Sequence, residues 1–303
     1  MVQPSTIAEQ LRTNMDGFTP SERKIARVLL ANYPMVGLDT IAQFAARAHV
    51  SGPSILRWVA RLGFDSYGAF QSKLRAELEV RLQSPLARHE TPNTQIDDND
   101  FLAHFAHKLH TLMQDTIAHI PRGEFDGAVE LLCDTRRPVW LLGGRLTRPL
   151  AEVLANHLKA MRPDIELISS HPSNWPHAIA DMHKGDTLVI FDIRRYWEDA
   201  AHLADIASQR KLNIILFTDE FHSPITRVAR HILPAHLAHA SSWDANTPLM
   251  MLIDALVFAM SRKNKNSAHK RLSEIEQLRA IFAEKISTHG PQNTLESKTT
   301  FRA

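Results

Sequence analysis

The stretch Thr40–Phe64, TIAQFAARAHVSGPSILRWVARLGF, constrains the fold more than any other part of this 303-residue chain. It predicts two short helices joined by a tight turn, the first over about residues 40–47. The second begins after Ser51, a good N-cap residue, and tolerates Pro53 in its first turn. Apolar residues of the second helix recur at i, i+4 and i+7, which predicts one buried stripe of Ile55, Val59 and Leu62.

The opposite face of this second helix is polar and basic, which is the layout of a helix-turn-helix. In that motif the second helix packs by one face and offers the other, N-terminus first, to the major groove of DNA. Arg57 is placed to reach a guanine edge or a phosphate. The alternative is an ordinary helical hairpin with a solvated basic face. The candidate DNA contacts are Ser51, Pro53, Ser54, Arg57 and Arg61.

Charge and cysteine content exclude several classes of protein. The net charge is only +2, so blanket electrostatic binding of nucleic acid is excluded and any DNA contact must come from a local patch. Cys133 is the single cysteine, which excludes an intramolecular disulfide and a cysteine-based zinc site. The N-terminus has no pattern of a signal peptide, and the most apolar stretch, 249–260, is too short to span a bilayer. We therefore expect a soluble, cytoplasmic protein.

Residues 1–83 are expected to form an all-α domain. Thr19, Pro20 and Glu22 predict a capped helix start, because threonine at the N-cap and glutamate three residues later form a capping box. Further helices are predicted over about 5–15 and 67–82. Residues 84–98 hold two prolines and no apolar period, which predicts a linker.

Residues 99–286 are expected to form an α/β domain, followed by a disordered tail over 287–303. Short apolar strands are predicted at 139–142, 165–168, 187–193, 213–218 and 232–235, with helices between them. Such alternation predicts a doubly wound parallel sheet, with the proline-containing last strand at an edge. A helix over 101–120 opens the domain, and its expected inward residues are Phe101, Phe105, Leu109, Leu112 and Met113.

In an open parallel sheet, ligands bind beyond the carboxyl ends of the strands. Two loops qualify. A glycine turn into a helix after 139–142 lets a ligand approach the backbone, and the helix start favours an anion. Two adjacent arginines after 187–193 predict a fork for a carboxylate or phosphate, although a surface or interface salt bridge is the alternative. The candidate effector contacts are Gly143, Gly144, Arg145, Thr147, Asp192, Arg194, Arg195 and Tyr196.

No metal site, cofactor or catalytic residue is predicted. His104, His107 and His110 share a helix, but no carboxylate completes a ligand set, so a solvated face is expected. The chain contains no Gly-x-Ser-x-Gly, Walker A or His-Glu-x-x-His motif.

Both halves resemble one known family. The segments FTPSERKIA (18–26), TIA (40–42) and RWVARLGF (57–64), with Tyr67 and Phe70, resemble the N-terminal domain of RpiR/MurR-type bacterial transcriptional regulators. GGRLT (143–147), KGDTLVI (184–190), Thr218-Asp219 and SPI (223–225) resemble the sugar isomerase (SIS) domain that follows it in that family. The resemblance implies a dimeric or tetrameric DNA-binding regulator that senses a sugar phosphate.

One departure from the family pattern affects which effector this chain can bind. Most SIS domains carry a serine-rich loop at the position where this chain has DIRRYW (192–197). The alternatives for this loop are a phosphosugar ligand, a carboxylate or other small acid as ligand, or a subunit contact. The main hypothesis is a ligand-responsive regulator that binds an operator as a homodimer or tetramer. The alternatives are a DNA-binding protein whose second domain only dimerises and, on the SIS fold, a phosphosugar isomerase or lyase. For that enzyme, Asp192, Glu198 and His171 are the nominal acid–base groups.

Overall fold

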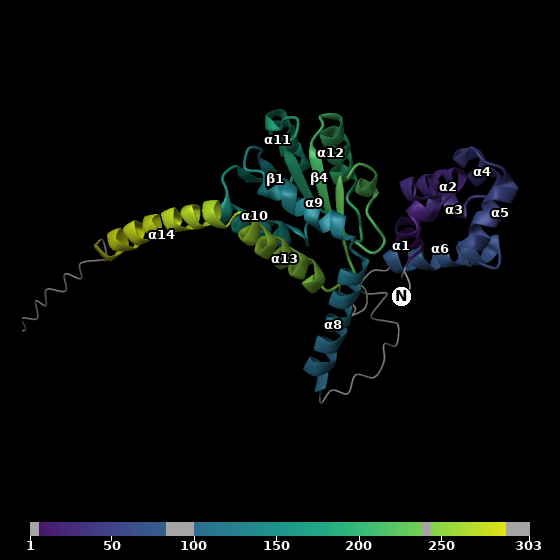
Figure 1. Ribbon diagram of the computed structural model, residues 1–303, viewed down its shortest axis with the longest axis horizontal. Coiled ribbons are helices and arrows are strands. Elements are labelled where there is room, and N and C mark those ends of the chain that lie inside the picture. Colours follow the sequence, from purple (N-terminus) through teal and green to yellow (C-terminus); the bar gives the residue numbers. More distant parts are fainter. Residues whose placement is uncertain (1–5, 83–99, 238–243, 289–303) are drawn as a thin grey trace, which may run out of the picture.

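The computed structural model describes residues 6–82, 100–237 and 244–288, which form a helical domain, a sheet domain and two projecting helices (Figure 1). The predicted linker (84–98) and nearly all of the predicted disordered tail (287–303) lie outside the described residues. None of the helices within the described ranges is long and apolar enough to span a lipid bilayer.

Six helices and one 3-10 turn make up the N-terminal domain: α1 (Ile7–Thr13), η1 (Met15–Gly17), α2 (Pro20–Ala31), α3 (Met35–Leu38), α4 (Ile41–Ala48), α5 (Gly52–Arg61) and α6 (Tyr67–Leu82). The predicted capping box at Thr19 and Glu22 is confirmed, and Thr40 and Gln43 form a second one at the start of α4. Gly63 closes α5 with φ +94°, a conformation that favours glycine. The helix α3 is not predicted by the sequence pattern, since it is a single short turn.

Trp58 lies at the centre of this domain's core. Its indole is fully buried and makes edge-to-face contacts with three other aromatic rings, Phe18, Phe44 and Phe70, at centroid distances of 6.2 to 6.4 Å. The predicted stripe of Ile55, Val59 and Leu62 is also buried. One face of α5 is therefore fixed in the core, and its other face remains outside.

The sheet domain contains a five-stranded parallel sheet in the order β2-β1-β3-β4-β5. Its strands are β1 (Val139–Gly143), β2 (Ile165–Leu167), β3 (Thr187–Phe191), β4 (Asn213–Asp219) and β5 (His231–Ala235). The predicted parallel, doubly wound sheet is confirmed, and the proline-containing strand β5 lies at an edge. Pro234 is tolerated there because an edge strand does not need every N–H for the ladder.

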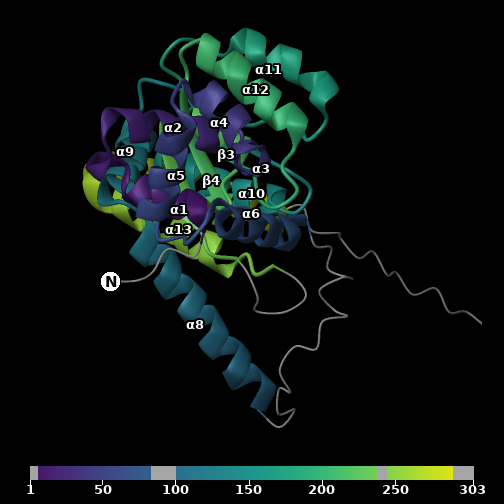
Figure 2. The ribbon, with the colours of Figure 1, turned by 90° about the vertical axis from the view of Figure 1, so that its right-hand side faces the viewer.

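Helices cover both faces of the sheet, as Figure 2 shows from the side of the N-terminal domain. Odd positions of β1 pack on one helical layer: α9 (Arg122–Cys133), α10 (Arg148–Met161) and α13 (Thr247–Lys263). Even positions pack on the other: α11 (Trp175–Asp181) and α12 (Glu198–Gln209). The short turns η3 (Pro172–Asn174) and η4 (Pro224–Arg227) complete the connections.

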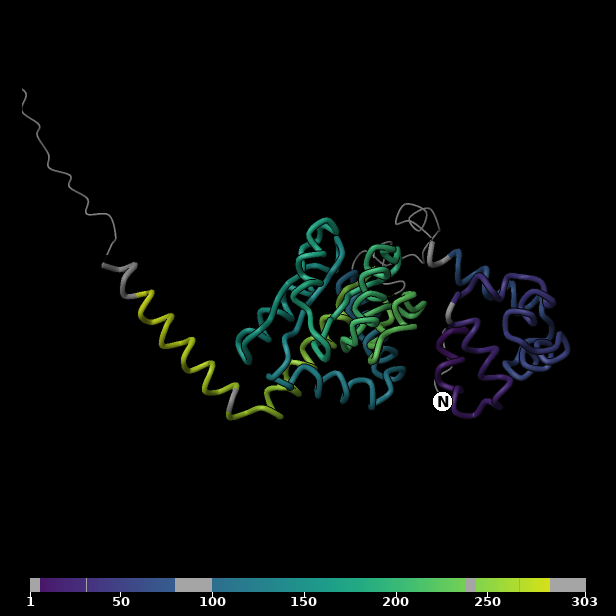
Figure 3. The backbone as a smooth tube through the Cα atoms, turned by 90° about the horizontal axis from the view of Figure 1, so that it is seen from above, coloured from purple at the N-terminus to yellow at the C-terminus, as the bar shows by residue number. Residues whose placement is uncertain are grey.

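The expectation for the helix at 101–120 is wrong in its first half. α8 (Phe101–His119) exists, but Phe101 is 53% exposed, and Phe105 stacks on it rather than entering a core. The reason is that only the C-terminal end of α8 reaches β5 and α13, while its first turns project from the body (Figures 1 and 2). α14 (Lys265–Thr288) likewise leads away from the sheet at the end opposite the N-terminal domain (Figure 3).

Candidate functional site

The outer face of α5 is exposed at the far end of the N-terminal domain. α5 packs against α2, α4 and α6, and Ser51, Pro53 and Arg57 on its other side face solvent. Leu56, beside them, is 44% exposed. Ser54 lies 2.9 Å from the Ser51 hydroxyl and accepts a hydrogen bond from Arg57, so the polar groups gather at the N-terminal half of the helix. This is the half of a recognition helix that meets base edges.

Arg61 differs from the other predicted DNA contacts because its guanidinium already has partners. It donates to both carboxylate oxygens of Glu22, at 2.9 and 2.7 Å, and to the carbonyl of Gly17 at 2.8 Å. It also lies over the ring of Phe18. The Glu22 carboxylate is the capping group of α2, so Arg61 ties the end of α5 to the start of α2.

The sheet domain brings together three loops at the carboxyl ends of β1, β3 and β4. In the first, the Gly144 N–H donates to the Thr147 hydroxyl, and this hydroxyl donates to the carbonyl of Phe191 at the end of β3. Thr147 is only 3% exposed. Thr147 therefore holds the loop after β1 against the end of β3. The start of α10, with Gly144 and exposed Arg145, remains at the surface.

Gly143 is required by a close backbone approach, which leads to a testable prediction. An added Cβ would lie 2.7 Å from the backbone N and Cα of Arg148, so alanine needs a shift of α10 itself. We expect Gly143→Ala to lower the free energy of unfolding by about 1–3 kcal/mol, as overpacking does. Gly144→Ala is the matched control, since its Cβ would meet nothing nearer than 3.7 Å. Urea unfolding followed by circular dichroism measures both, and equal midpoints would contradict the prediction.

The second loop is anchored by buried carboxylates. Asp192 accepts a hydrogen bond from the Trp197 N–H at 3.1 Å and another from the Ser223 hydroxyl. Asp219, at the end of β4, accepts from the Tyr196 hydroxyl at 2.6 Å. These contacts link the loop 192–197 to the ends of β4 and η4. Asp192 and Tyr196 therefore both take part in holding the loop, and their predicted contact with an effector stays a prediction.

Arg194 and Arg195 do not form the fork that their adjacency predicts. The backbone of Arg194 is left-handed, with φ +58°, and its N–H donates to Asp219. Its side chain is 8% exposed and lies 2.9 Å from the Asp244 carboxylate and 3.4 Å from that of Glu220. Arg195 points outward and is exposed. The backbone conformation separates the two side chains, which sequence adjacency does not reveal.

The charges around Arg194 follow from burial and pairing. Burial by itself lowers the pKa of the Arg194 guanidinium, but the carboxylates of Glu220, Asp219 and Asp244 together raise it above its usual value. Burial raises the pKa of Glu220, which the charge of Arg194 partly offsets. Arg194 is therefore a permanent cation that partly offsets the charge of this group of acids.

The nominal acid–base groups of an enzyme differ in exposure. Asp192 is buried with the hydrogen bonds described above, whereas Glu198 and His171 are exposed on α12 and before η3. His104, His107 and His110 are exposed on α8, as the solvated-face interpretation predicts. Cys133 is half-buried, and burial raises the pKa of its thiol, which disfavours a thiolate nucleophile.

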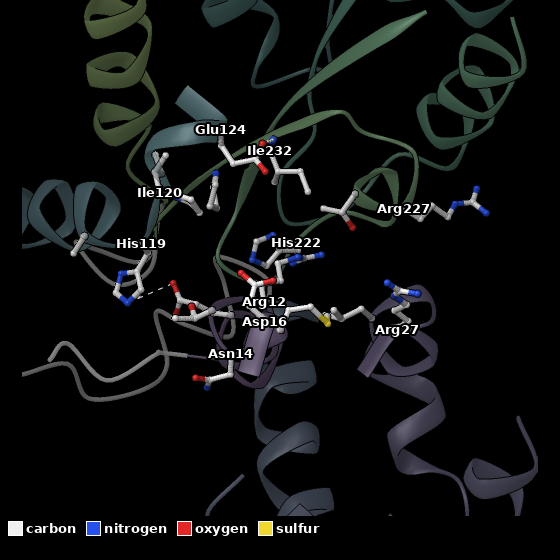
Figure 4. A pocket seen from close by; sticks show the side chains of 18 residues that line it. Arg12, Asn14, Asp16, Arg27, His119, Ile120, Glu124, His222, Arg227 and Ile232 are labelled. Carbon is white, nitrogen blue, oxygen red and sulfur yellow. Dashed lines mark hydrogen bonds and ion pairs between the residues drawn. The ribbon is translucent and has the colours of Figure 1, made fainter. Parts of the chain in front are cut away.

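A cavity of about 1340 Å³ lies between the N-terminal domain and the sheet domain (Figure 4). α1, η1 and α2 line one side of it, and the end of α8, the start of α9, η4 and β5 line the other. Thr6 and Glu9, at the start of α1, contact the sheet domain directly: the Thr6 hydroxyl donates to the Glu220 carbonyl at 3.1 Å. Sequence reasoning misses this junction, because its residues are up to 227 positions apart.

Comparison with known proteins supports both domains. The family model described as the helix-turn-helix domain of the rpiR family matches residues 5–81, and the SIS domain matches residues 134–259. An uncharacterised HTH-type transcriptional regulator of Haemophilus influenzae is 24% identical over 77% of this chain and 81% of its own. The HTH-type transcriptional regulator HexR of Pseudomonas aeruginosa is 24% identical over 74% of this chain and 76% of its own.

A solved structure shares the whole architecture. The Vibrio vulnificus NanR protein, solved with ManNAc-6P, aligns over 94% of this chain and 99% of its own, with a TM-score of 0.51 and 18% identity. At that identity the likeness shows the fold. The helical domain with its exposed α5, the parallel sheet behind it and the two domain matches lead to one assignment: the chain belongs to the RpiR-type transcriptional regulators, with an N-terminal helix-turn-helix and a C-terminal SIS domain.

Proposed function

We propose that this regulator binds operator DNA through the outer face of α5 and that a small anionic metabolite on the sheet domain changes its affinity for DNA. The observation that carries the DNA part is the exposure of Ser51 and Arg57, with half-buried Ser54 between them, on a helix whose other face is locked into the core by Trp58. A rigid helix with a free polar N-terminal half fits the major groove.

The effector site is proposed at the loops that follow β1 and β3. The start of α10 offers backbone N–H groups and a positive dipole end to an anion, with Gly144 at the surface. Arg145 and Arg195 are exposed at these two loops, and both remain able to pair with a phosphate or carboxylate. NanR of Vibrio vulnificus was solved with the sugar phosphate ManNAc-6P, which supports the same ligand class here. The class proposed is sugar phosphates or small organic acids.

A chain of contacts connects this site to the DNA-binding domain. Arg194, in the second loop, pairs with the carboxylate of Glu220, and the carbonyl of Glu220 accepts a hydrogen bond from Thr6. Thr6 is the N-cap of α1 in the helical domain. A ligand that moves the loop 192–197 would act on the position of α1 through Glu220. Through this route the effector could bind more tightly when the N-terminal domain has one orientation than when it has another. Such a difference in affinity is required for a ligand to shift the equilibrium between two orientations.

The proposal includes a homodimer or a higher symmetric assembly. Phe101, Leu102 and Ile117 of α8 are 53%, 77% and 62% exposed, and Ile281 and Phe282 of α14 are 52% and 68% exposed. Exposed apolar side chains on two projecting helices favour contact with a second copy. Two helix-turn-helix units related by symmetry would read the two halves of a palindromic operator.

Arg195→Ala tests the effector site. We expect a gel shift on DNA upstream of the protein's own gene to respond to one anion from a panel of sugar phosphates and organic acids. In the variant, the anion concentration for half-maximal response should rise about 10-fold or more, because a charge-assisted hydrogen bond is lost. Affinity for DNA without the anion should stay as in the unaltered chain.

The control is Arg136→Ala, which removes an arginine that is 86% exposed before β1, at the other end of the sheet. The double variant Arg194→Ala, Arg195→Ala should also lose the response. It also removes the guanidinium that pairs with Glu220 and Asp244, so the single variant tests the effector site more specifically. A normal response of Arg195→Ala would place the effector elsewhere.

A further inference from the structure

Three metal-ligating side chains meet at the junction of the two domains. Glu9 comes from α1, His119 is the last residue of α8, and His236 follows β5. Their side chains are only 7%, 8% and 8% exposed. One donor atom from each lies within 4.8 Å of the other two. The residues are far apart in sequence, so the fold alone brings them together.

The two distances from the carboxylate to the imidazoles match a tetrahedral zinc site. With bonds of about 2.0–2.1 Å, two ligand atoms of tetrahedral Zn²⁺ lie roughly 3.3 Å apart. The Glu9 carboxylate oxygen Oε1 lies 3.5 Å from Nε2 of His119 and 3.2 Å from Nε2 of His236. A metal ion can therefore bind between these atoms with small side-chain adjustments.

The contact of His119 Nδ1 with the backbone suits Nε2 of the same ring to bind a metal ion. Nδ1 lies 2.6 Å from the backbone carbonyl of Asp115, one helical turn earlier. An N–H at Nδ1 that donates to a carbonyl leaves the lone pair of Nε2 for a metal, and metal-bound histidines commonly have such a partner. Nε2 of His119 is buried and has no hydrogen-bond partner within the described residues. The His119 side chain is 8% exposed, and its 3.5 Å contact with the Glu9 carboxylate is longer than a metal–ligand geometry requires, so this nitrogen is available to a metal ion.

We propose that Glu9, His119 and His236 bind one divalent transition-metal ion, with Zn²⁺ the best fit to two imidazoles and a carboxylate. Glu9 and His119 also line the 1340 Å³ cavity, so the fourth coordination position opens toward it and is available to water or an anion. Figure 4 shows His119 at the cavity wall.

The surrounding charges are mixed. Glu220 lies near His236 and adds negative charge, while Arg12, one turn after Glu9, adds positive charge. His236 is held by its backbone N–H, which donates to the Thr116 hydroxyl at 2.9 Å. Nε2 of His236 and Oε1 of Glu9 lie 3.2 Å apart, and a metal ion bound by both atoms would take the place of their direct contact.

A metal at this place would join the two domains. Its carboxylate ligand belongs to the helical domain, and its histidine ligands belong to the sheet domain. The bound ion would fix the orientation of α1, and hence of the DNA-binding helices, on the sheet domain. This proposal stands independently of the effector site, because it uses none of its residues.

The test measures Zn²⁺ binding by the full chain without an affinity tag, after treatment with a chelator. Equilibrium dialysis with metal analysis should give one Zn²⁺ per chain, and Co²⁺ should give the strong visible absorption of a tetrahedral site. The double variant His119→Ala, His236→Ala should bind at least about 100-fold more weakly, since loss of an outer-shell partner alone costs 10–100-fold. Glu9→Gln provides a nearly isosteric second variant.

The matched control is His104→Ala, His107→Ala, which removes two exposed histidines from the same helix and should bind Zn²⁺ as the unaltered chain does. Circular dichroism checks that each variant is folded. Zn²⁺ should also slow amide hydrogen exchange in α1. Equal Zn²⁺ affinity for the unaltered chain and the double histidine variant would overturn the site, and bound Zn²⁺ without protection of α1 would overturn the joining of the domains.

Discussion

Replacing Arg57 by alanine is expected to weaken operator binding about 5- to 150-fold. The guanidinium lies exposed on the outer face of α5, beside Ser54, where a recognition helix meets base edges. A bidentate contact of arginine with guanine contributes about 1–3 kcal/mol of discrimination, which corresponds to that range of affinity. Fluorescence anisotropy with labelled operator DNA, at one fixed salt concentration, measures the change.

Arg75→Ala is the control, because it removes the same charge from an exposed position on α6 and leaves α5 intact. Its affinity should fall far less than that of Arg57→Ala. If Arg57 contacts a base, its loss should relax specificity at one position of the operator. Equal affinities of Arg57→Ala and the unaltered chain would remove Arg57 from the interface.

Trp58→Ala should have the largest effect on stability. The indole is fully buried and touches three aromatic rings, so its removal leaves a cavity that the domain cannot readily fill. Replacement of a buried tryptophan by alanine costs about 3–5 kcal/mol. A whole domain is stable by only about 5–15 kcal/mol, so the helix-turn-helix should unfold at much lower urea concentration.

Leu56→Ala, on the exposed side of the same helix, serves as the control and should change stability by no more than about 0.5 kcal/mol. Urea unfolding followed by circular dichroism compares the variants, and the N-terminal domain is followed as the first transition. Should Trp58→Ala unfold at the same urea concentration as Leu56→Ala, the description of the core would be wrong.

Most of the helices and strands can be predicted from the sequence, because helix caps and apolar periods depend on residues only a few positions apart. The capping box at Thr19, the stripe on α5 and the buried strands are set by neighbours three to seven positions apart. The parallel direction of the strands follows from the alternation of strands and helices. These features need no knowledge of distant contacts.

The predictions from sequence fail where contacts between residues far apart in the chain determine burial or pairing. The apolar residues of α8 do recur with a helical period. Phe101 is nevertheless 53% exposed, because no other element among the described residues packs against it. Arg194 looks like an anion ligand in sequence, yet Glu220 and Asp244 reach it from 26 and 50 positions away along the printed sequence. The group of Glu9, His119 and His236 shows no spacing signal at all.

Binding of the arginine-bearing face of α5 to DNA, controlled by an anion on the sheet domain, can be measured in one titration. The full chain is titrated with DNA from upstream of its own gene and with random duplex at the same salt, with and without each anion of the panel. We expect a marked preference for the upstream DNA and a change of at least fivefold in that affinity with one anion. Equal binding to both duplexes under every condition would contradict this expectation.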